Sequence, residues 1–137
     1  MIEMGGRTGA TCIPELISMY YGFDFYEKIL QNALGITLDF TPEKEGLPCM
    51  AKLLMSPVNG IITNIDEKRL ARVRQKGIQV TLDFPVGHPV EEMENGTTRI
   101  GHVVAGADSV EELDEIIGLV YSCIEVDGKS LEELWRK

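Results

Sequence analysis

The chain has 137 residues, of which 44% are hydrophobic and 26% charged, and its formal net charge is −9. This length and composition are typical of one globular domain or two small lobes, and the acidity argues against nucleic acid or an anionic membrane as the main partner. Because no apolar run is long enough to span a membrane and no signal peptide is recognisable, we expect a cytoplasmic protein.

The cysteines and histidines give no sign of a disulfide framework or a zinc site. Cys12, Cys49 and Cys123 are odd in number and show no paired spacing, so we expect free thiols in a reducing compartment. The histidines, His88 and His102, stand far apart and no Cys-x-x-Cys pair accompanies them. A zinc site is therefore not expected.

A helix, a glycine break and a second helix are predicted by the pattern CIPELISMYYGFDFYEKILQNALG. Pro14 suits the first turn of the first helix, and Gly22 can end that helix in a left-handed conformation. Asp24 is expected to cap the second helix, with Glu27 as the reciprocal partner of a capping box. Gly35 ends the second helix.

The middle of the chain predicts a small sheet. A short charged helix is expected to begin after Asp66 and to end at Gly77, and a turn is expected at Asn95 and Gly96. Alternating or β-rich runs predict the strands. These strands are expected over residues 50–55, 60–65, 78–84 and 99–105.

The clearest helix is predicted over residues 109–126, where Ser109 and Glu112 form a capping box before an apolar stripe. Ser130 and Glu133 repeat the box before a last short helical turn. We therefore expect an α+β fold in which a helical piece is followed by a small sheet with about two covering helices. The boundary between these parts is expected near residues 35–48.

Near the start, the stretch EMGGRTGA places an acid and a base four residues apart. In an extended segment Glu3, Gly5 and Arg7 would lie on one face. Glu3 can then ligate Mg²⁺, Arg7 can hold a phosphate or carboxylate, and Gly5 and Gly6 can let the backbone approach a ligand closely. On spacing alone, the alternative is a surface Glu and Arg at a frayed N-terminus.

Three other side chains are candidates for a function. Cys12 stands at a predicted helix N-terminus, which would lower the pKa of its thiol, but no His or Asn lies at a known family spacing from it. His102 lies within a predicted strand and is interpreted as a structural or edge residue. His88, between a glycine and a proline, is interpreted as a turn residue.

The order of these elements resembles a known enzyme family. Residues 2–35 resemble the end of an ATP-grasp domain, in which a late strand carries a Glu and, four residues later, an Arg, before two helices. The stretches SPVNGIITNI, IQVTLDFPVGHPV and RIGHVVAGADSVEEL resemble the small C-terminal subdomain of the L-amino-acid-ligase and biotin-carboxylase-like branch. The resemblance implies a remnant of the ATP-grasp domain over residues 1–40 and a C-terminal α+β subdomain over residues 41–137.

The resemblance also implies a chemistry. ATP-grasp ligases activate a carboxylate as an acyl phosphate and pass it to an amine, largely by positioning and charge neutralisation. By position, Glu3 matches the Mg²⁺-binding Glu, and Arg7 matches the Arg that stabilises the substrate carboxylate or the intermediate. The resemblance also implies that Gly5 and Gly6 contact the cofactor. Gly5 stands where many members of the family have a metal-ligating Asn, and glycine has no side-chain oxygen that could bind the metal.

The lysines, the glycine-rich loop and the first metal-binding acid that hold ATP in this family are not found in the sequence. We therefore expect a C-terminal portion of a ligase that is inactive alone and uses ATP and Mg²⁺ only with an N-terminal ATP-grasp lobe, on the same polypeptide or a split subunit. The alternative is a non-catalytic module that binds a partner or itself. In either case the surface that the lobe would cover is expected to be apolar and to favour a homodimer.

Overall fold

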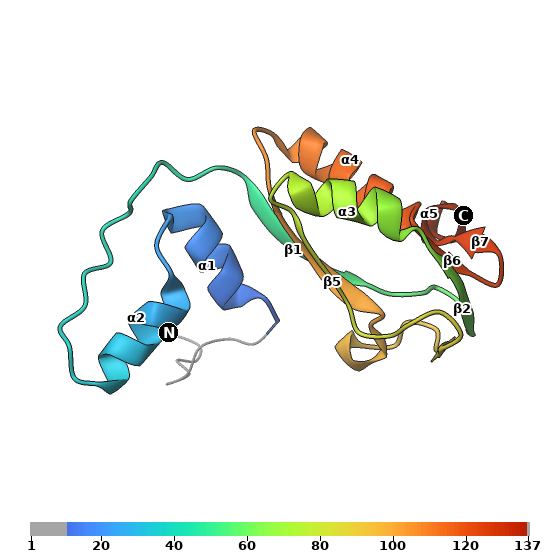
Figure 1. The fold of residues 1–137 in the computed structure, drawn as a ribbon, viewed down its shortest axis with the longest axis horizontal. Helices are drawn as coiled ribbons and strands as arrows, with labels where there is room; N and C mark the ends of the chain where they lie inside the picture. The colour runs from blue at the N-terminus through green and yellow to red at the C-terminus, as the bar shows by residue number, and fades with distance from the viewer. Residues whose placement is uncertain (1–10, 137) are drawn as a thin grey trace.

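The computed structural model describes residues 11–136, which form the mixed α+β fold that the sequence predicts (Figure 1). The helices of this part are α1 (Ile13–Tyr21), α2 (Phe25–Ala33), α3 (Glu67–Gln75), α4 (Val110–Tyr121) and α5 (Leu131–Trp135), with a 3-10 turn η1 (Gly96–Thr98). The strands are β1 (Cys49–Leu54), β2 (Gly60–Ile65), β3 (Gln79–Leu82), β4 (Pro89–Val90), β5 (Gly101–Gly106), β6 (Ile124–Val126) and β7 (Lys129–Ser130).

The two N-terminal helices form where the sequence predicts them. Gly22 ends α1 with a φ of 87°, a left-handed conformation that glycine adopts without strain. The Asp24 side chain accepts hydrogen bonds from the backbone N–H groups of Tyr26 and Glu27 and so caps α2. The reciprocal half of the predicted capping box is absent, because the Glu27 carboxylate accepts from Gln31 Nε2 at 2.9 Å instead.

A three-stranded antiparallel sheet, in the order β1-β5-β3, joins the helical part to the rest. α4 packs on β1 and β5, and α3 on β3, while α1 also contacts β1 and β5 (Figure 1). Val103 and Ala105 of β5 belong to the main core, so by the alternation of a strand Val104 and Gly106 face the other way. Met19 of α1 packs there, with its Sδ 3.1 Å from the position of a Cβ on Gly106. α1 thus covers the sheet face opposite the core.

The main hydrophobic core lies within residues 49–136. Its largest fully buried side chains come from strands and helices alike: Leu54, Ile62, Leu70, Ile100, Val103, Val120, Ile124, Val126 and Leu131. Between residues 11 and 48 the buried residues are Cys12, Pro14 and Phe23. The N-terminal helices therefore contribute little to this core.

A second antiparallel sheet, in the order β4-β2-β6-β7, corrects one prediction. The helix predicted over 109–126 ends at Tyr121, and Ile124–Val126 forms β6 against β2. The β-branched Ile124 and Val126 are buried in that pairing, which overrides the helical spacing. Asp127 and Gly128, with φ of 48° and 76°, then turn the chain into β7. That Asp-Gly pair is itself a strong hairpin signal in the sequence.

The two predicted C-terminal capping boxes differ in completeness. At α5 the box is complete: Ser130 Oγ accepts from the Glu133 N–H at 3.2 Å, and Glu133 Oε2 accepts from the Ser130 N–H at 3.2 Å. At α4 only the Ser109 half forms, because the Glu112 carboxylate accepts from the Asp108 N–H. Both caps nonetheless start their helices where predicted.

Residues 34–48 connect α2 to β1 without a helix or strand and run around the outside of the helical pair (Figure 1). Phe40 in this connection meets Phe23 edge-on at 6.1 Å between ring centroids, and Phe23 also stacks on Tyr21 at 5.8 Å. The connection coincides with the boundary predicted near residues 35–48. The division into domains 1–40 and 41–137 stays a prediction.

Candidate functional site

The site residues proposed from the sequence, Glu3, Gly5, Gly6 and Arg7, lie outside the described residues 11–136. Within that range, no three His, Cys, Asp or Glu side chains are grouped so that they could hold a metal ion. The structure describes instead the place where the chain enters α1 and the groups that surround it.

The backbone at the start of α1 is strained. Thr11 and Cys12 have φ of 65° and 64°, in the left-handed region that costs a residue other than glycine about 1–3 kcal/mol. Cys12 is the N-cap of α1 but makes no side-chain capping hydrogen bond. Conformations of this kind cluster at binding and catalytic sites, because the surroundings must enforce them.

The thiol of Cys12 is not the activated nucleophile that its position suggested. Burial raises the pKa of Cys12, the nearby Glu15 carboxylate raises it further, and the positive charge of Arg99 lowers it in part. The predicted lowering of the Cys12 pKa is therefore wrong, because loss of water at a buried thiol outweighs the helix N-terminus. A protonated thiol is a poor nucleophile.

Glu15 and Tyr26 link the two N-terminal helices. The Tyr26 hydroxyl donates a 2.7 Å hydrogen bond to Glu15 Oε1, and this bond raises the pKa of Tyr26. The other oxygen, Oε2, is buried and accepts no hydrogen bond within the described part of the chain. An open groove of about 540 Å³ runs beside the pair, and Ser18 and Gln79 also line it.

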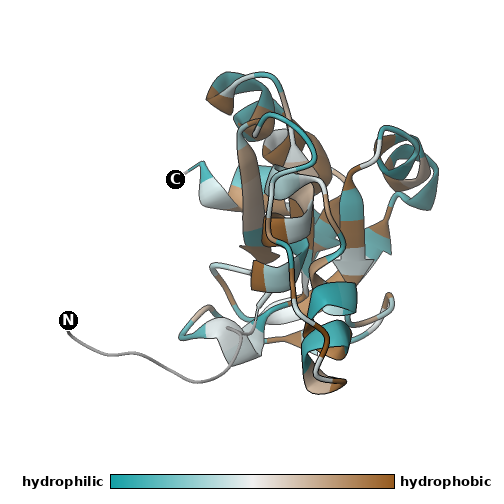
Figure 2. Cartoon of the chain, turned by 90° about the vertical axis from the view of Figure 1, so that its left-hand side faces the viewer, coloured by the Kyte–Doolittle hydropathy of each residue, from teal (hydrophilic) through white to brown (hydrophobic). Residues whose placement is uncertain are grey.

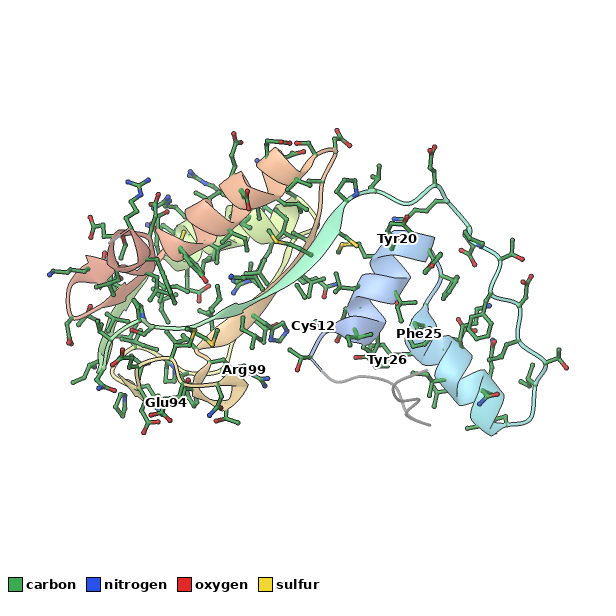
Figure 3. The ribbon with its side chains drawn as sticks, turned by 180° about the vertical axis from the view of Figure 1, so that it is seen from behind. Cys12, Tyr20, Phe25, Tyr26, Glu94 and Arg99 are labelled. Carbon is green, nitrogen blue, oxygen red and sulfur yellow. The ribbon has the colours of Figure 1, made fainter. Side chains whose placement is uncertain are left out.

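Arg99 approaches the start of α1 from the C-terminal part. Its Nε donates a 2.8 Å hydrogen bond to Asp83 Oδ2, which fixes the direction of the guanidinium. Figure 3 shows Arg99 on the side of the molecule that faces Cys12, whereas Glu94 lies farther away on the same side. The influence of Arg99 on the Cys12 pKa agrees with this placement. A cation, an acid and a phenol therefore gather where the chain enters α1.

Sequence reasoning did not single out Glu15, Tyr26 or Arg99. In the sequence, Glu15 is an ordinary acid in the first turn of one helix, and Tyr26 is an ordinary aromatic residue in the first turn of the next. Arg99 follows the predicted Asn-Gly turn, but nothing local indicates that this turn faces α1. Tertiary packing brings them together, so no sequence window contains the signal.

One of the two histidines lies in the connection between β3 and β4, and the other lies within a strand. His88 lies in a turn, as predicted, and its ring stacks on Phe84 with 3.8 Å between centroids. His102 was interpreted as a structural or edge residue. It lies in β5, the central strand of its sheet, so the edge alternative is wrong. Its backbone pairs with both Leu53 and Thr81.

An apolar surface covers the outer side of the N-terminal part. We call it the hairpin surface and define it by Tyr26, Leu30, Leu34, Ile36 and Phe40, whose exposures lie between 50% and 79%. Figure 2 views the molecule from this side, where apolar positions recur on the helices and the connection. α2 buries no residue in this structure. A helix with an exposed apolar side normally packs against something.

The family of the chain follows from its C-terminal part. The family model described as L-amino acid ligase C-terminal domain 2 matches residues 52–127. The chain belongs to this family. The match spans the sequence from β1 to the β6–β7 turn, and so includes Arg99 and Asp83 of the L-amino acid ligase C-terminal domain.

A solved structure has a fold similar to that of this chain. The crystal structure of phosphoribosylglycinamide synthetase from Anaerococcus prevotii matches with a TM-score of 0.70 and 22% identity. The match covers 90% of this chain and 32% of that one, so this chain spans about a third of the matched protein's length. Because 90% exceeds what residues 52–137 could supply, the likeness extends into the helical part. Together, the family match and this likeness in fold confirm the resemblance to the C-terminal portion of an ATP-grasp ligase.

Two further findings complete the comparison. No curated protein matches the sequence of this L-amino acid ligase C-terminal domain. Within residues 11–136, no helix is both long enough and apolar enough to cross a membrane.

Proposed function

We propose that the chain is the C-terminal part of an ATP-grasp carboxylate–amine ligase and that it completes the active site of that ligase without being active alone. The family match over residues 52–127 is the observation that carries the proposal. The likeness to a synthetase structure over 90% of the chain supports it at the level of the fold.

In this proposal, Glu3 and Arg7 are the residues that reach the chemistry. Glu3 supplies a carboxylate for Mg²⁺, and Arg7 neutralises the substrate carboxylate or the negative charge that develops on it. Gly5 and Gly6 leave the backbone open to the cofactor. The strained turn at Thr11, immediately after this stretch, supports the idea that the surroundings hold the chain in a set direction there.

ATP and Mg²⁺, when bound by the complete enzyme, supply the activation of the carboxylate. Within residues 11–136 no three suitable side chains stand together as a metal site of their own. We therefore expect neither ATP nor Mg²⁺ to bind tightly to this chain alone. The remaining ligands are proposed to come from an N-terminal ATP-grasp lobe.

The hairpin surface is the proposed contact with that lobe. Its apolar side chains are exposed, although apolar and aromatic residues gathered on one side of a helix normally pack against another element. Covering them with the lobe would bury apolar area at roughly 25 cal/mol per Å². It would also bring the lobe to the same end of the molecule as Cys12, Tyr26 and the start of α1 (Figure 3).

The test is turnover of the chain joined to its ATP-grasp lobe, with substitutions at Arg7. Arg7→Ala should lower turnover by about 10²–10³-fold, as loss of a residue that stabilises developing charge does. Arg7→Lys should restore part of the loss, since it keeps the charge but not the planar fork. Unchanged turnover in Arg7→Ala would remove Arg7 from the site.

The second candidate function is a non-catalytic module that associates with itself. The exposure of the hairpin surface favours it, because an uncovered apolar surface promotes association. Both candidates predict a homodimer for the chain alone, so light scattering after size-exclusion chromatography separates them only when the lobe is added. A lobe that binds the hairpin surface should convert this homodimer into a one-to-one complex.

A further inference from the structure

The helices α3 and α4 lie next to each other and carry opposite charges on their outer faces. They contact each other on the core side of the β1-β5-β3 sheet, away from α2 (Figure 1). Arg69 of α3 joins them, because its Nη2 donates a 2.7 Å hydrogen bond to Ser122 Oγ at the end of α4. The residues that both helices turn away from the sheet are exposed.

The exposed face of α3 is positive. Lys68 and Arg72 lie one helical turn apart, on the side opposite the buried Leu70 and Val73. Neither cation forms an ion pair within residues 11–136, whereas Arg74 is paired inside the chain. We call Lys68 and Arg72 the positive stripe. Its charge is available to a partner outside the chain.

The exposed face of α4 is negative. Glu111, Asp114 and Glu115 are exposed, and none of them forms an ion pair within the described part of the chain. We call these three residues the acidic face. Two of them, Asp114 and Glu115, line an open groove of about 440 Å³ beside α4. Because like charges one helical turn apart repel each other, a cation placed against this face would be stabilising.

Gly118 lines the same groove and leaves the surface of α4 low at this point. A Cβ on Gly118 would meet no atom of a neighbouring element within 4 Å, so the packing of this chain does not require a glycine there. A glycine inside a helix is unfavourable relative to alanine. A close approach by something outside the chain accounts for its presence. On α3, the exposed Ala71 beside the positive stripe is also small.

We propose that these faces bind a second copy of this chain, with α3 of each copy against α4 of the other. A two-fold axis between the helices brings the positive stripe of each copy to the acidic face of its partner, so the same contact forms twice. Gly118 and Ala71 allow the helices to approach closely. Charge complementarity selects a second copy, because each chain carries both of the faces that the contact needs.

This contact is separate from the hairpin surface and does not depend on the assignment as a ligase. It lies on the sheet face opposite α1, so two copies joined in this way leave the start of α1 open. Exposed ion pairs stabilise less than buried apolar area does. The contact should therefore form at higher protein concentration than the contact through the hairpin surface.

The experiment follows sedimentation velocity over a range of protein concentrations, with Leu30→Ser and Leu34→Ser present in every sample to remove the hairpin contact. A monomer–dimer equilibrium is expected in this background. Lys68→Glu with Arg72→Glu should weaken the dimer at least about tenfold, because like charges then face each other.

The opposite reversal, Asp114→Lys with Glu115→Lys, should weaken the dimer by a similar factor. It does so although it lowers the net negative charge of the chain and hence the general repulsion between copies. Mixing the two charge-reversed variants should restore a dimer that contains one chain of each kind, since each acidic α3 then meets a basic α4. General effects of net charge do not predict this recovery.

The matched control is Lys52→Glu with Lys129→Glu, which changes the net charge as the Lys68 and Arg72 variant does, but at exposed cations on β1 and β7. It should weaken the dimer far less. Gly118→Gln, a change that the open space around Gly118 tolerates within the chain, should also weaken the dimer because it fills the space that a second copy needs. Circular dichroism establishes that every variant is folded.

Three results would overturn the proposal: a sedimentation coefficient that does not change with concentration in the background variant, an equal loss in the control, or charge-reversed variants that do not pair when mixed. The hairpin contact is removed in every sample and turnover is not measured. The failure of this proposal is therefore distinguishable from the failure of the proposed function.

Discussion

The hydroxyl of Tyr26 on α2 donates a 2.7 Å hydrogen bond to Glu15 Oε1 on α1, and the second oxygen of Glu15 is buried without a partner among residues 11–136. This bond ties together two helices that otherwise bury few side chains. It also places a carboxylate with spare acceptor capacity close to Cys12, where the chain enters α1.

Tyrosine titration tests this link. The hydrogen bond to Glu15 raises the pKa of Tyr26, and burial raises that of Tyr121, from the ordinary value of about 10. The folded state thus favours the neutral phenols. Their stabilising effect is complete below the unfolded pKa and is lost as pH rises through the folded pKa.

Two late steps are therefore expected in the ultraviolet absorbance titration of the folded chain. Tyr26→Phe should remove one of them, and Tyr121→Phe, the control within the core, should remove the other. If the titration of Tyr26→Phe keeps both late steps, the bond to Glu15 does not persist in solution.

The reactivity of Cys12 offers a second prediction. Because burial and Glu15 raise its pKa, the thiol should be protonated at about pH 7 and react slowly with iodoacetamide. Arg99→Gln should raise the pKa of Cys12 further, since it removes the charge that lowers it. The measurement is the pH dependence of alkylation in a background of Cys49→Ser and Cys123→Ser. Rapid alkylation near neutral pH would restore the nucleophile hypothesis.

The capping box of α5 is expected to stabilise the C-terminal end. Ser130→Ala removes the side-chain acceptor of the Glu133 N–H and should lower the free energy of unfolding by about 0.5–2 kcal/mol. Glu133→Gln keeps an oxygen that can accept from the Ser130 N–H, so its effect should be smaller. Urea denaturation measures both. Equal losses for the two variants would contradict the role of the box.

The hairpin surface is expected to control association. Leu30→Ser with Leu34→Ser should shift the chain toward monomer while changing the free energy of unfolding by no more than about 0.5 kcal/mol, since both leucines are exposed. Val110→Ser is the matched control, because Val110 is 61% exposed but lies at the start of α4. Light scattering after chromatography reports the mass. A monomer already in the unsubstituted chain would disprove the dimer.

Local chemistry explains which elements could be predicted. Asp66 and Ser130 cap their helices, and Gly22 ends α1, because each such signal acts through neighbouring backbone groups. The β6 strand was missed because Ile124 continues the helical apolar spacing of Val120 and Tyr121, and only pairing with β2 takes this segment out of the helix. A strand that depends on a distant partner leaves a weak local signal.

The described part of the site was harder to predict than the fold. Arg99 and Asp83 are ordinary charged residues in their own sequence windows. They form an ion pair only because the segment after η1 and the loop after β3 meet in space. Glu3 and Arg7, in contrast, were identified by resemblance to a family, and they lie outside the residues that the structure describes.

The most direct measurement is amino-acid-dependent release of ADP by the chain joined to an N-terminal ATP-grasp lobe. The proposed function predicts turnover for the joined protein, none for this chain alone, and loss of turnover in Arg7→Ala. If the joined protein folds and binds ATP but releases no ADP with any amino acid, or if Arg7→Ala retains full turnover, the chain does not complete a ligase in the way proposed.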